Sequence, residues 1–485
     1  MQVLDAIVNW VLNVAGVTVM FPFMVFLIGL VFRARPAQLF RSALMIASGI
    51  TGLLMVLSLL VGSLAPATQA MADRFNLQLT ISDVGWPTLA AISFGTTYAF
   101  TLFVLIFALN VVLILLNWVR TLDIDLWNYW SFAFVFSMTW VVTRSFPLAL
   151  LAAMVYAVFC FKLADWTAPV VADYFKMPGI STPHGDSVVW SPIGMALDAL
   201  WDRIPGIRDI RWEAGTLHQR LGVLGEPAVV GFLIGLLVGT LGYLRLPLTG
   251  EAVAEMLKLG VAAAAYLVLM PRMISLLMDG LLPIAEAARS FVMSRFPGRA
   301  VYIGVDAAVL VGDTAIVATA LLMTPITLLI AALLPGNRVL PFADLSVLVF
   351  LLIWSVAPSR GNVFRSLLNA ILVVVPVMLL MATDLAPQVT AVAREVGADV
   401  PPDTLVTAMA AGFKVLAWPI LMFAWALGGS PVPASKLLLA AIFLVVYLGL
   451  IWLVRHRPSE RFAAAGAQAQ GQPAQAAGRG TAVRR

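Results

Sequence analysis

Charged residues are scarce in this sequence. Asp, Glu, Lys and Arg together make up 11% of its 485 residues, whereas soluble proteins carry about 25%. Apolar residues make up 61%, and the mean hydropathy is +0.98. A soluble protein needs a polar surface, and so few charged residues cannot supply one. The composition therefore excludes a soluble globular protein and predicts an all-α polytopic membrane protein.

Cysteine and catalytic motifs are scarce as well. Cys160 is the only cysteine and lies in the apolar run LALLAAMVYAVFCFKL, which excludes a disulfide framework and a cysteine-ligated metal site. The sequence has no P-loop, GxSxG, HExxH or Rossmann glycine motif, so nothing supports an ATPase, a hydrolase or a zinc enzyme. No catalytic residue, metal ligand or cofactor is predicted. The N-terminus lacks the features of a cleaved signal peptide, and we expect its first apolar stretch to be a retained helix.

Long apolar runs are what the sequence has instead. A helix needs roughly 20 apolar residues to cross the hydrocarbon core. On this criterion we predict spans at residues 9–31, 40–62, 96–119, 128–145, 147–163, 226–244, 252–275, 314–334, 341–357, 366–384, 405–427 and 435–454.

The basic residues predict the orientation. The first connection contains Arg33, Arg35 and Arg41, and the tail RHRPSERF is also basic, so both are expected in the cytoplasm and the N-terminus outside. The net charge of +5 lies in such connections and does not indicate nucleic-acid binding. An outside N-terminus and an inside C-terminus require an odd number of spans, so one of the twelve is wrong. The weakest are 128–145 and 405–427, and we expect roughly eleven spans.

The C-terminal end differs in composition from the rest. After about Phe462 the chain is rich in Ala, Gln and Gly and has no apolar run. We therefore expect one membrane-embedded domain over residues 1–462 and a disordered cytoplasmic tail over 463–485.

Two apolar stretches are interrupted by polar residues and glycine. Residues 81–100 contain Asp83, Gly85 and Pro87, and residues 301–322 contain two aspartates around Gly312. The two stretches occupy corresponding positions in the two halves of the chain. Paired, interrupted segments of this kind indicate an inverted-repeat transporter with its binding site near the middle of the membrane.

Carboxylates within these stretches are candidate substrate ligands, because an ionisable group at membrane depth is costly unless it has a partner or a role. Asp306 and Asp313 are seven residues apart, two turns on one face if the helix is continuous. Each can accept a hydrogen bond from a substrate hydroxyl or cap a half-helix. Asp83, in ISDVGWP, has the same two interpretations.

Three further residues are candidate substrate ligands. His184, in TPHGDS, is either a surface residue or a hydrogen-bonding group beside a polar ligand. Glu226 precedes an apolar run and either interacts with the helix dipole or accepts a substrate hydroxyl. Asn128 belongs to DIDLWNYW, which favours an interfacial aromatic belt, with stacking of Trp127 or Trp130 on a sugar as the alternative.

The order of uncommon strings resembles one family over most of the chain. The sequence resembles the galactitol-type permeases, the IIC components of the phosphoenolpyruvate-dependent phosphotransferase system, and more distantly the ascorbate permeases. The resemblance runs to about residue 380 and rests on these strings: ISDVGWP, DIDLWNYW, PHGDS, GEP followed by VGFLIGLLVG, LMPRMISLLMDGLLPIAEAAR, IGVDAAVLVGDTA, PGNRVLPFADL and SRGNVFRSLL.

The resemblance implies a homodimer in the bacterial inner membrane, with a scaffold domain and a mobile core domain. Two re-entrant hairpins, at 81–100 and 301–322, would lie in the core, which moves the sugar or alditol in an elevator-like manner. It also implies that a separate IIB subunit, supplied by IIA, phosphorylates the substrate. His184 and Asp306 fall at positions where the family contacts its substrate.

The sequence departs from the family pattern at two positions. Asp313 and Ser131 each stand where galactitol permeases have a histidine, so a different hexitol, pentitol or sugar is as consistent with the sequence as galactitol. The chain has no phosphorylatable cysteine loop, since Cys160 lies within an apolar run. The polypeptide would then be a non-catalytic permease subunit of a phosphotransferase complex. The alternative is a proton-coupled secondary transporter on the same fold, with Asp306 or Asp313 as the proton site.

Overall fold

The computed structural model describes residues 33–456, apart from 75–79, 95, 97, 213–225, 245–246, 296–300, 342, 399 and 401, together with parts of 19–30. Both the first apolar stretch up to residue 18 and the predicted tail lie outside the described residues. The described chain is mostly helical. Its helices are α3 (Pro36–Arg74), α4 (Gly85–Phe94), α5 (Ala99–Leu115), α6 (Leu126–Thr143), α7 (Phe146–Tyr174), α8 (Ser191–Trp201), α10 (Pro227–Tyr243), α11 (Gly250–Arg295), α12 (Thr314–Leu333), α13 (Leu348–Val356), α14 (Val363–Asn369), α15 (Val375–Glu395), α16 (Met409–Phe413), α17 (Ala417–Leu427) and α18 (Ala434–His456).

Short strands, which the sequence did not predict, lie between the helices. They are β1 (Ile81–Asp83), β2 (Thr121–Asp123), β3 (Ile180–Ser181), β4 (Tyr302–Gly304) and β5 (Leu405–Thr407). They form two small parallel sheets, one of β1 and β5 and one in the order β2-β4-β3. Each sheet joins segments far apart in the chain, and each strand leads into a turn or a helix.

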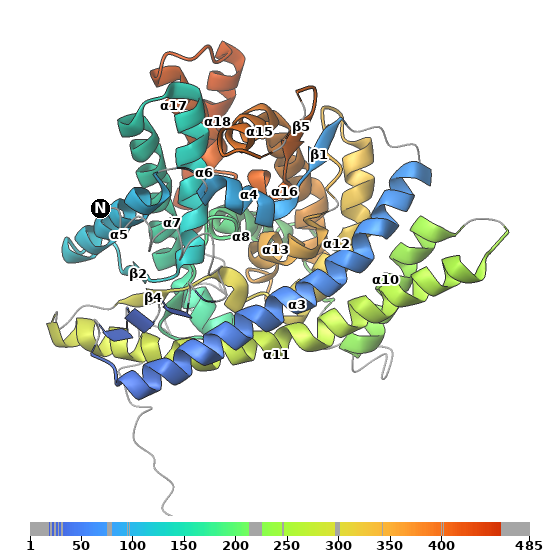
Figure 1. The fold of residues 1–485 in the computed structure, drawn as a ribbon, viewed down its shortest axis with the longest axis horizontal. Helices are drawn as coiled ribbons and strands as arrows, with labels where there is room; N and C mark the ends of the chain where they lie inside the picture. Colours follow the sequence, from blue (N-terminus) through green and yellow to red (C-terminus); the bar gives the residue numbers. More distant parts are fainter. Residues whose placement is uncertain are drawn as a thin grey trace, which may run out of the picture.

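Two long helices, α3 and α11, lie together with the shorter α10 along one side of the molecule. α3 and α11 cross the lower part of Figure 1 side by side, and α10 packs on α11. Glycines recur every four residues on α10, at Gly231, Gly235 and Gly239, and a Cβ there would lie within 3.0 Å of the α11 backbone. Small residues at this spacing let two membrane helices approach closely, which explains the run VGFLIGLLVG.

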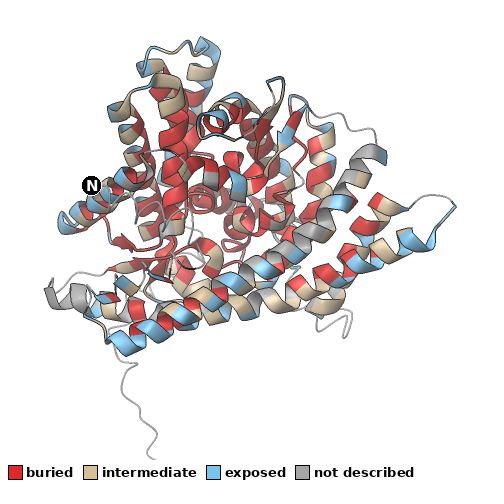
Figure 2. Cartoon of the chain, viewed as in Figure 1, coloured by how far each residue is buried: buried red, intermediate tan, exposed pale blue. Residues whose placement is uncertain are grey.

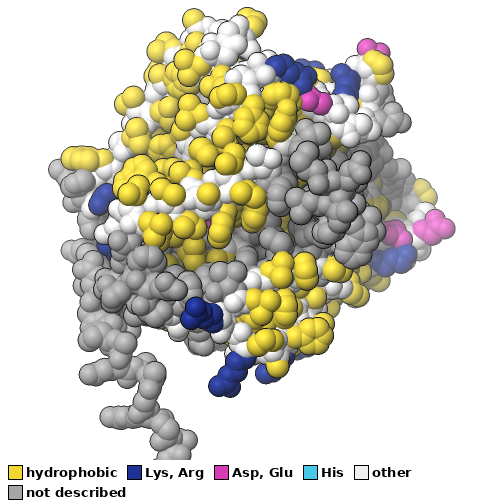
Figure 3. Space-filling view, turned by 60° about the vertical axis from the view of Figure 1, so that its left-hand side comes forward, with side chains coloured by type: hydrophobic (Ala, Val, Ile, Leu, Met, Phe, Trp, Pro, Cys, Tyr) yellow, Lys and Arg dark blue, Asp and Glu magenta, His cyan; other side chains and the backbone are white. Residues whose placement is uncertain are grey.

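Polar groups are inside this protein and many apolar side chains are outside. Leu427 and Val445 are 78% and 71% exposed, whereas Lys414 and Asp123 are 1% and 0% exposed. Buried residues concentrate in the helices above α3 and α11 (Figure 2). On the face in Figure 3, hydrophobic side chains cover a large part of the described surface, and charged side chains are few. This distribution agrees with the predicted all-α membrane protein, because lipid favours exposed apolar surface and disfavours exposed charge.

Four of the described helical segments are long and apolar enough to cross a membrane: Phe146–Tyr174, Thr314–Leu333, Val363–Glu395 and Ala434–Arg455. Each contains or overlaps a predicted span. α3 and α11, with 39 and 46 residues, extend well beyond the predicted 40–62 and 252–275. The predicted span 341–357 is reduced to α13, after a 3₁₀ turn at Leu345–Val347.

The predicted span 405–427 is wrong as a continuous helix. Its residues form β5, then α16, then a break at Lys414, then α17. The break has a physical cause, because the Lys414 side chain is buried and forms an ion pair with Asp186 rather than facing lipid. This segment was one of the two that we identified as weakest. The other, 128–145, coincides with α6.

The contact between α8 and α13 allows a direct test of the packing. A Cβ built on Gly194 of α8 would lie 1.7 Å from the carbonyl oxygen of Trp354 in α13. We expect Gly194→Ala to destabilise the protein by about 1–3 kcal/mol, because two backbones must separate. Thermal unfolding in detergent measures this. The control is Gly449→Ala in α18, where a Cβ meets nothing within 4 Å. Equal unfolding temperatures for both variants would contradict the close contact.

Candidate functional site

The three-stranded sheet brings polar residues from distant parts of the chain together. In a parallel sheet, the carboxyl ends of all strands lie at one edge. Here the last residues of the three strands are in register, with Gly304 of β4 paired with Asp123 of β2 and with Ser181 of β3. The residues that follow these strands include Asp125, His184 and Asp306. Pairing of three very short strands therefore gathers aspartates and a histidine into one buried cluster.

His184 lies at the centre of this cluster. Its Nδ1 is 3.0 Å from Oδ2 of Asp306 and 3.1 Å from Oδ1 of Asn128. Asn128 donates from Nδ2 to Oδ1 of Asp123 at 2.7 Å, which assigns its Oδ1 as an acceptor. Because both neighbours of Nδ1 are acceptors, we assign a hydrogen to this nitrogen. The ring is thereby fixed in orientation, with Nε2 directed away from Asp306.

Asp306 both caps a helix and contacts His184. Its Oδ1 accepts from the backbone N–H of Ala308 at 2.6 Å, at the start of the 3₁₀ turn Ala307–Val309. Its own N–H donates to Oδ2 of Asp125 at 2.8 Å, and Asp125 caps α6. Asp306 can therefore cap a helical turn and also belong to a polar site, because Oδ1 accepts from the backbone while Oδ2 faces His184.

Asp186 and Lys414 complete the cluster, and sequence reasoning assigned neither of them a role. Oδ1 of Asp186 is 2.6 Å from Nζ of Lys414 and accepts from Ser131 at 3.2 Å. Oδ2 of Asp186 is 3.8 Å from Nε2 of His184. The signals were present, since Asp186 is two residues from His184 and Lys414 interrupts an apolar run.

Asp83 lies at the other, two-stranded sheet. Its carboxylate accepts from the N–H groups of Gly85 and Ala343, at 3.1 and 2.9 Å. Next to it, Asp344 accepts from the N–H groups of Trp86 and Ala410, at 2.6 and 2.8 Å, and so holds the first turns of α4 and α16. The contacts of Asp83 are those of a turn-stabilising residue, and sequence reasoning missed Asp344.

Asp313 and Glu226 have other neighbours. Asp313 caps α12 through Ala315 and Ile316 and accepts from the Tyr174 hydroxyl at 3.1 Å. Glu226 is exposed at the start of α10, where its side chain makes no capping hydrogen bond. Within the described part of the chain, no hydrogen bond or ion pair links either residue to His184. A role for these two residues, or for Asp83, in substrate binding stays a prediction.

The string DIDLWNYW is not an interfacial belt. Asp123, Asp125 and Trp130 are all buried, and one face of the Trp130 ring lies 3.1 Å from Nζ of Lys414. Trp127 is half-buried and makes an edge contact with Trp86, with 5.7 Å between ring centroids. Of the two tryptophans considered for stacking, Trp127 is therefore the one at the margin of the cluster.

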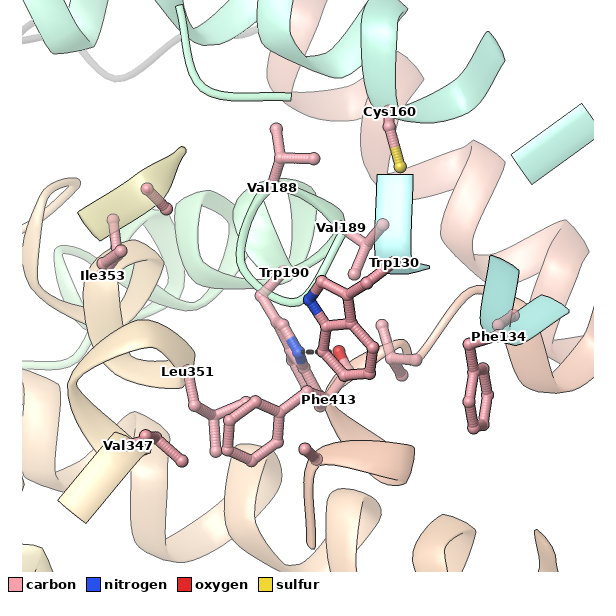
Figure 4. Close-up of a cluster of buried hydrophobic side chains, with 14 of the residues drawn as sticks. Trp130, Phe134, Cys160, Val188, Val189, Trp190, Val347, Leu351, Ile353 and Phe413 are labelled. Carbon is pink, nitrogen blue, oxygen red and sulfur yellow. Dashed lines mark hydrogen bonds between the residues drawn. The ribbon is translucent and has the colours of Figure 1, made fainter. Parts of the chain in front are cut away.

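The buried groups suit hydrogen bonding to a polyhydroxy compound. Carboxylates accept from hydroxyl groups, and histidine and lysine can donate to them. Among the described residues, no group of three or more His, Cys, Asp or Glu side chains is arranged to hold a metal ion. Trp130, Trp190 and Phe413 belong to one group of buried hydrophobic side chains (Figure 4), in which the Trp190 Nε1 donates to the Phe413 carbonyl at 2.6 Å. Trp130 joins this group to the polar cluster, because its ring also contacts Nζ of Lys414.

Comparison with known proteins identifies related chains. Residues 10–403 match the family EIIC-GAT, described as the sugar-specific permease component of the PTS system. The chain is 34% identical, over 406 residues, to the galactitol-specific EIIC component of the PTS system of Escherichia coli K12, covering 84% of this chain and 88% of the relative. It is also 34% identical to a putative permease IIC component of the same strain, covering 80% and 87%.

Proposed function

Because the chain belongs to the EIIC-GAT family of phosphotransferase-system permeases, we propose that it translocates a galactitol-like alditol for phosphorylation by a separate IIB subunit. The observation that supports this proposal most strongly is membership in the family. The proposal includes the class of transport and the need for IIA and IIB partners. A buried cluster of carboxylates around a histidine is the kind of site that an uncharged polyol requires.

His184, Asp306 and Asn128 are the proposed core of the substrate site. His184 contacts both Asp306 and Asn128 through its Nδ1, and all three side chains are buried. Their backbones follow β3 or β4 or lie in the first turn of α6, so the sheet and the helix cap pre-organise them before substrate arrives. Asp83, Glu226 and Asp313 remain candidates at the periphery.

The proposed transport mechanism is an elevator-like movement of a core domain. Two interrupted segments, β1 with α4 and β4 with the 3₁₀ turn before α12, would form the re-entrant hairpins of an inverted repeat. The long helices α3, α10 and α11 would form the scaffold of a homodimer. We place the protein in the inner membrane with about eleven spans, the N-terminus outside and the C-terminus in the cytoplasm, following the arginines of the first connection.

A proton-coupled secondary transporter is the second candidate. The observation in its favour is that Asp123, Asp125 and Asp306 are buried and linked by hydrogen bonds from backbone to carboxylate, as proton-carrying carboxylates often lie close together. The family relationship favours the phosphotransferase permease, since its members work with phosphorylating partners.

Uptake assays distinguish the two candidates. In cells expressing the protein with IIA and IIB, we expect labelled galactitol to accumulate as its phosphate, and accumulation to stop when phosphoenolpyruvate-dependent phosphotransfer is removed. A proton uncoupler should have little direct effect, because the phosphoryl transfer drives accumulation. Accumulation of free alditol that collapses with the uncoupler would refute the phosphotransferase assignment. A strain lacking only this chain is the control.

A further inference from the structure

Lys414 is a buried lysine at the break between α16 and α17. Its side chain is fully buried, and a cation at membrane depth is costly unless it has partners. The family match ends at residue 403, so Lys414 lies beyond the segment that the family model matches. Its ammonium group contacts Asp186, which faces Nε2 of His184, whereas Asp306 lies at Nδ1 on the other edge of the ring.

All three N–H donors of Lys414 have acceptors within the protein. Nζ lies 2.6 Å from Oδ1 of Asp186, 3.4 Å from the carbonyl oxygen of Ala410 and 3.1 Å from the centroid of the Trp130 ring. A lysine ammonium has three donors and no acceptor, so these contacts account for all of them. Lys414 is therefore placed to fix its neighbours rather than to donate to a substrate itself.

The neighbour that Lys414 fixes is Asp186. Oδ1 of Asp186 is occupied by Lys414 and by the Ser131 hydroxyl. Oδ2 accepts no hydrogen bond from the described residues and faces Nε2 of His184 at 3.8 Å, which is too long for a hydrogen bond. Gly185 between them allows this arrangement, because a Cβ there would lie 2.7 Å from Cβ of Ser131.

Because these two atoms are 3.8 Å apart, one hydroxyl oxygen to the side of the line that joins them can reach both at hydrogen-bonding distance. It can donate to Oδ2 of Asp186 and accept from Nε2 of His184 in the imidazolium form. Carboxylates at both edges of the ring, Asp306 and Asp186, stabilise that form.

We propose that Lys414 is a positioning residue that holds Asp186 so that Asp186 and His184 together bind one hydroxyl of the substrate. This inference rests on the proposed function and names a specificity element within it. Lys414 also neutralises Asp186, so that the carboxylate stays in place in the unliganded protein.

The test uses the purified full chain, with galactitol and singly deoxygenated galactitols, one for each distinct hydroxyl, in calorimetric titrations. We compare wild type, Lys414→Met and the double variant Lys414→Met/Asp186→Asn. The double variant avoids leaving Asp186 as a buried charge without its cation, and so separates positioning from folding. The loss of a charged hydrogen bond predicts galactitol affinity lower by roughly 10-fold to 100-fold in both variants.

The ratio of the affinities for galactitol and for each deoxygenated compound separates the two roles. A purely structural role of Lys414 would leave these ratios unchanged in the variants. One of the deoxygenated compounds should bind wild type at least roughly 10-fold more weakly than galactitol, yet bind the double variant as well as galactitol does, because the partner of the missing hydroxyl is already gone. The other compounds should lose affinity equally in both proteins. The matched control is Lys436→Met/Asp384→Asn, which removes an ion pair of 2.5 Å elsewhere and should bind galactitol normally.

Two results would overturn the inference. If the double variant binds galactitol like wild type, or discriminates against every deoxygenated compound as wild type does, Lys414 does not position a substrate ligand and the proposed function is unaffected. If wild type itself binds no alditol, the proposed function fails and this inference fails with it.

Discussion

His184→Ala is expected to lower the affinity for an alditol by roughly 100-fold or more. The His184 ring touches Asp306 and Asn128 through Nδ1 and faces Asp186 through Nε2. Its removal takes away a substrate hydrogen bond together with the contacts that the ring makes with these three side chains. Each charged hydrogen bond contributes about 1.5–3 kcal/mol, and 1.4 kcal/mol is a factor of ten in affinity. Calorimetric titration with galactitol, on protein whose thermal unfolding has been checked, measures the loss.

Asp306→Asn should lower the affinity for an alditol by a comparable factor, for a different reason. The amide retains an acceptor for the Ala308 N–H, so the helix cap survives. It loses the charge that faces Nδ1 of His184. Asp313→Asn is the informative comparison, because the Asp313 side chain caps α12 and accepts a hydrogen bond from Tyr174 but, among the described residues, makes no hydrogen bond or ion pair with His184. We therefore expect Asp313→Asn to lower binding much less than Asp306→Asn. Normal binding by both His184→Ala and Asp306→Asn would refute the site assignment.

The sequence predicted the membrane helices because hydropathy acts locally. A run such as ASKLLLAAIFLVVYLGLIWLVRH, which forms α18, needs no information from elsewhere in the chain to be recognised. The strands could not be predicted in this way. β3 has two residues and β2 and β4 have three each, which is too short for an alternating pattern, and their partners are more than 50 residues apart in the chain.

The same reason explains which site residues were found. His184 and Asp306 are unusual in their local surroundings, so they could be identified one by one. Asp123 and Asp125 lie among aromatic residues, a composition that is typical of a membrane interface. Only the pairing of β2 with β4 places them inside the protein. In the sequence, Lys414 appears only as a charge that interrupts an apolar span. Its partner Asp186 is more than 200 residues away, so the ion pair could not be predicted from the local sequence.

The sequence predicted an interrupted segment around Asp306 and Asp313 and left open whether the two carboxylates cap half-helices or face a substrate. Helical spacing would place both carboxylates on one face, yet each begins its own helical segment with φ and ψ in the extended region. Asp is favoured at such N-cap positions. Two caps seven residues apart therefore indicate a broken segment rather than a stripe, and the broken segment directs the two side chains to different partners.

Arg365 is expected to be the residue whose loss destabilises the protein most. It lies on α14 with 1% of its side chain exposed, and its Nη1 is 2.9 Å from Asp198 and 2.8 Å from Asp202. Its Nη2 donates to the Arg208 carbonyl at 3.1 Å. The guanidinium thus fastens the connection after α8 to the helical core. Arg365→Met removes the cation beside a buried carboxylate, which costs about 3–5 kcal/mol.

Thermal unfolding in detergent measures the effect of Arg365→Met, and two comparisons establish its cause. Arg365→Met/Asp198→Asn should recover part of the stability, because no buried charge then lacks its counter-ion. Lys258→Ala should change stability by about 0–1 kcal/mol, because the Lys258–Glu255 pair is exposed. If Arg365→Met unfolds at the same temperature as Lys258→Ala, the buried ion pair contributes no more than a surface pair. The connection after α8 would then be held in place by its backbone hydrogen bonds, such as that from Val363 to the Trp212 carbonyl at 2.7 Å.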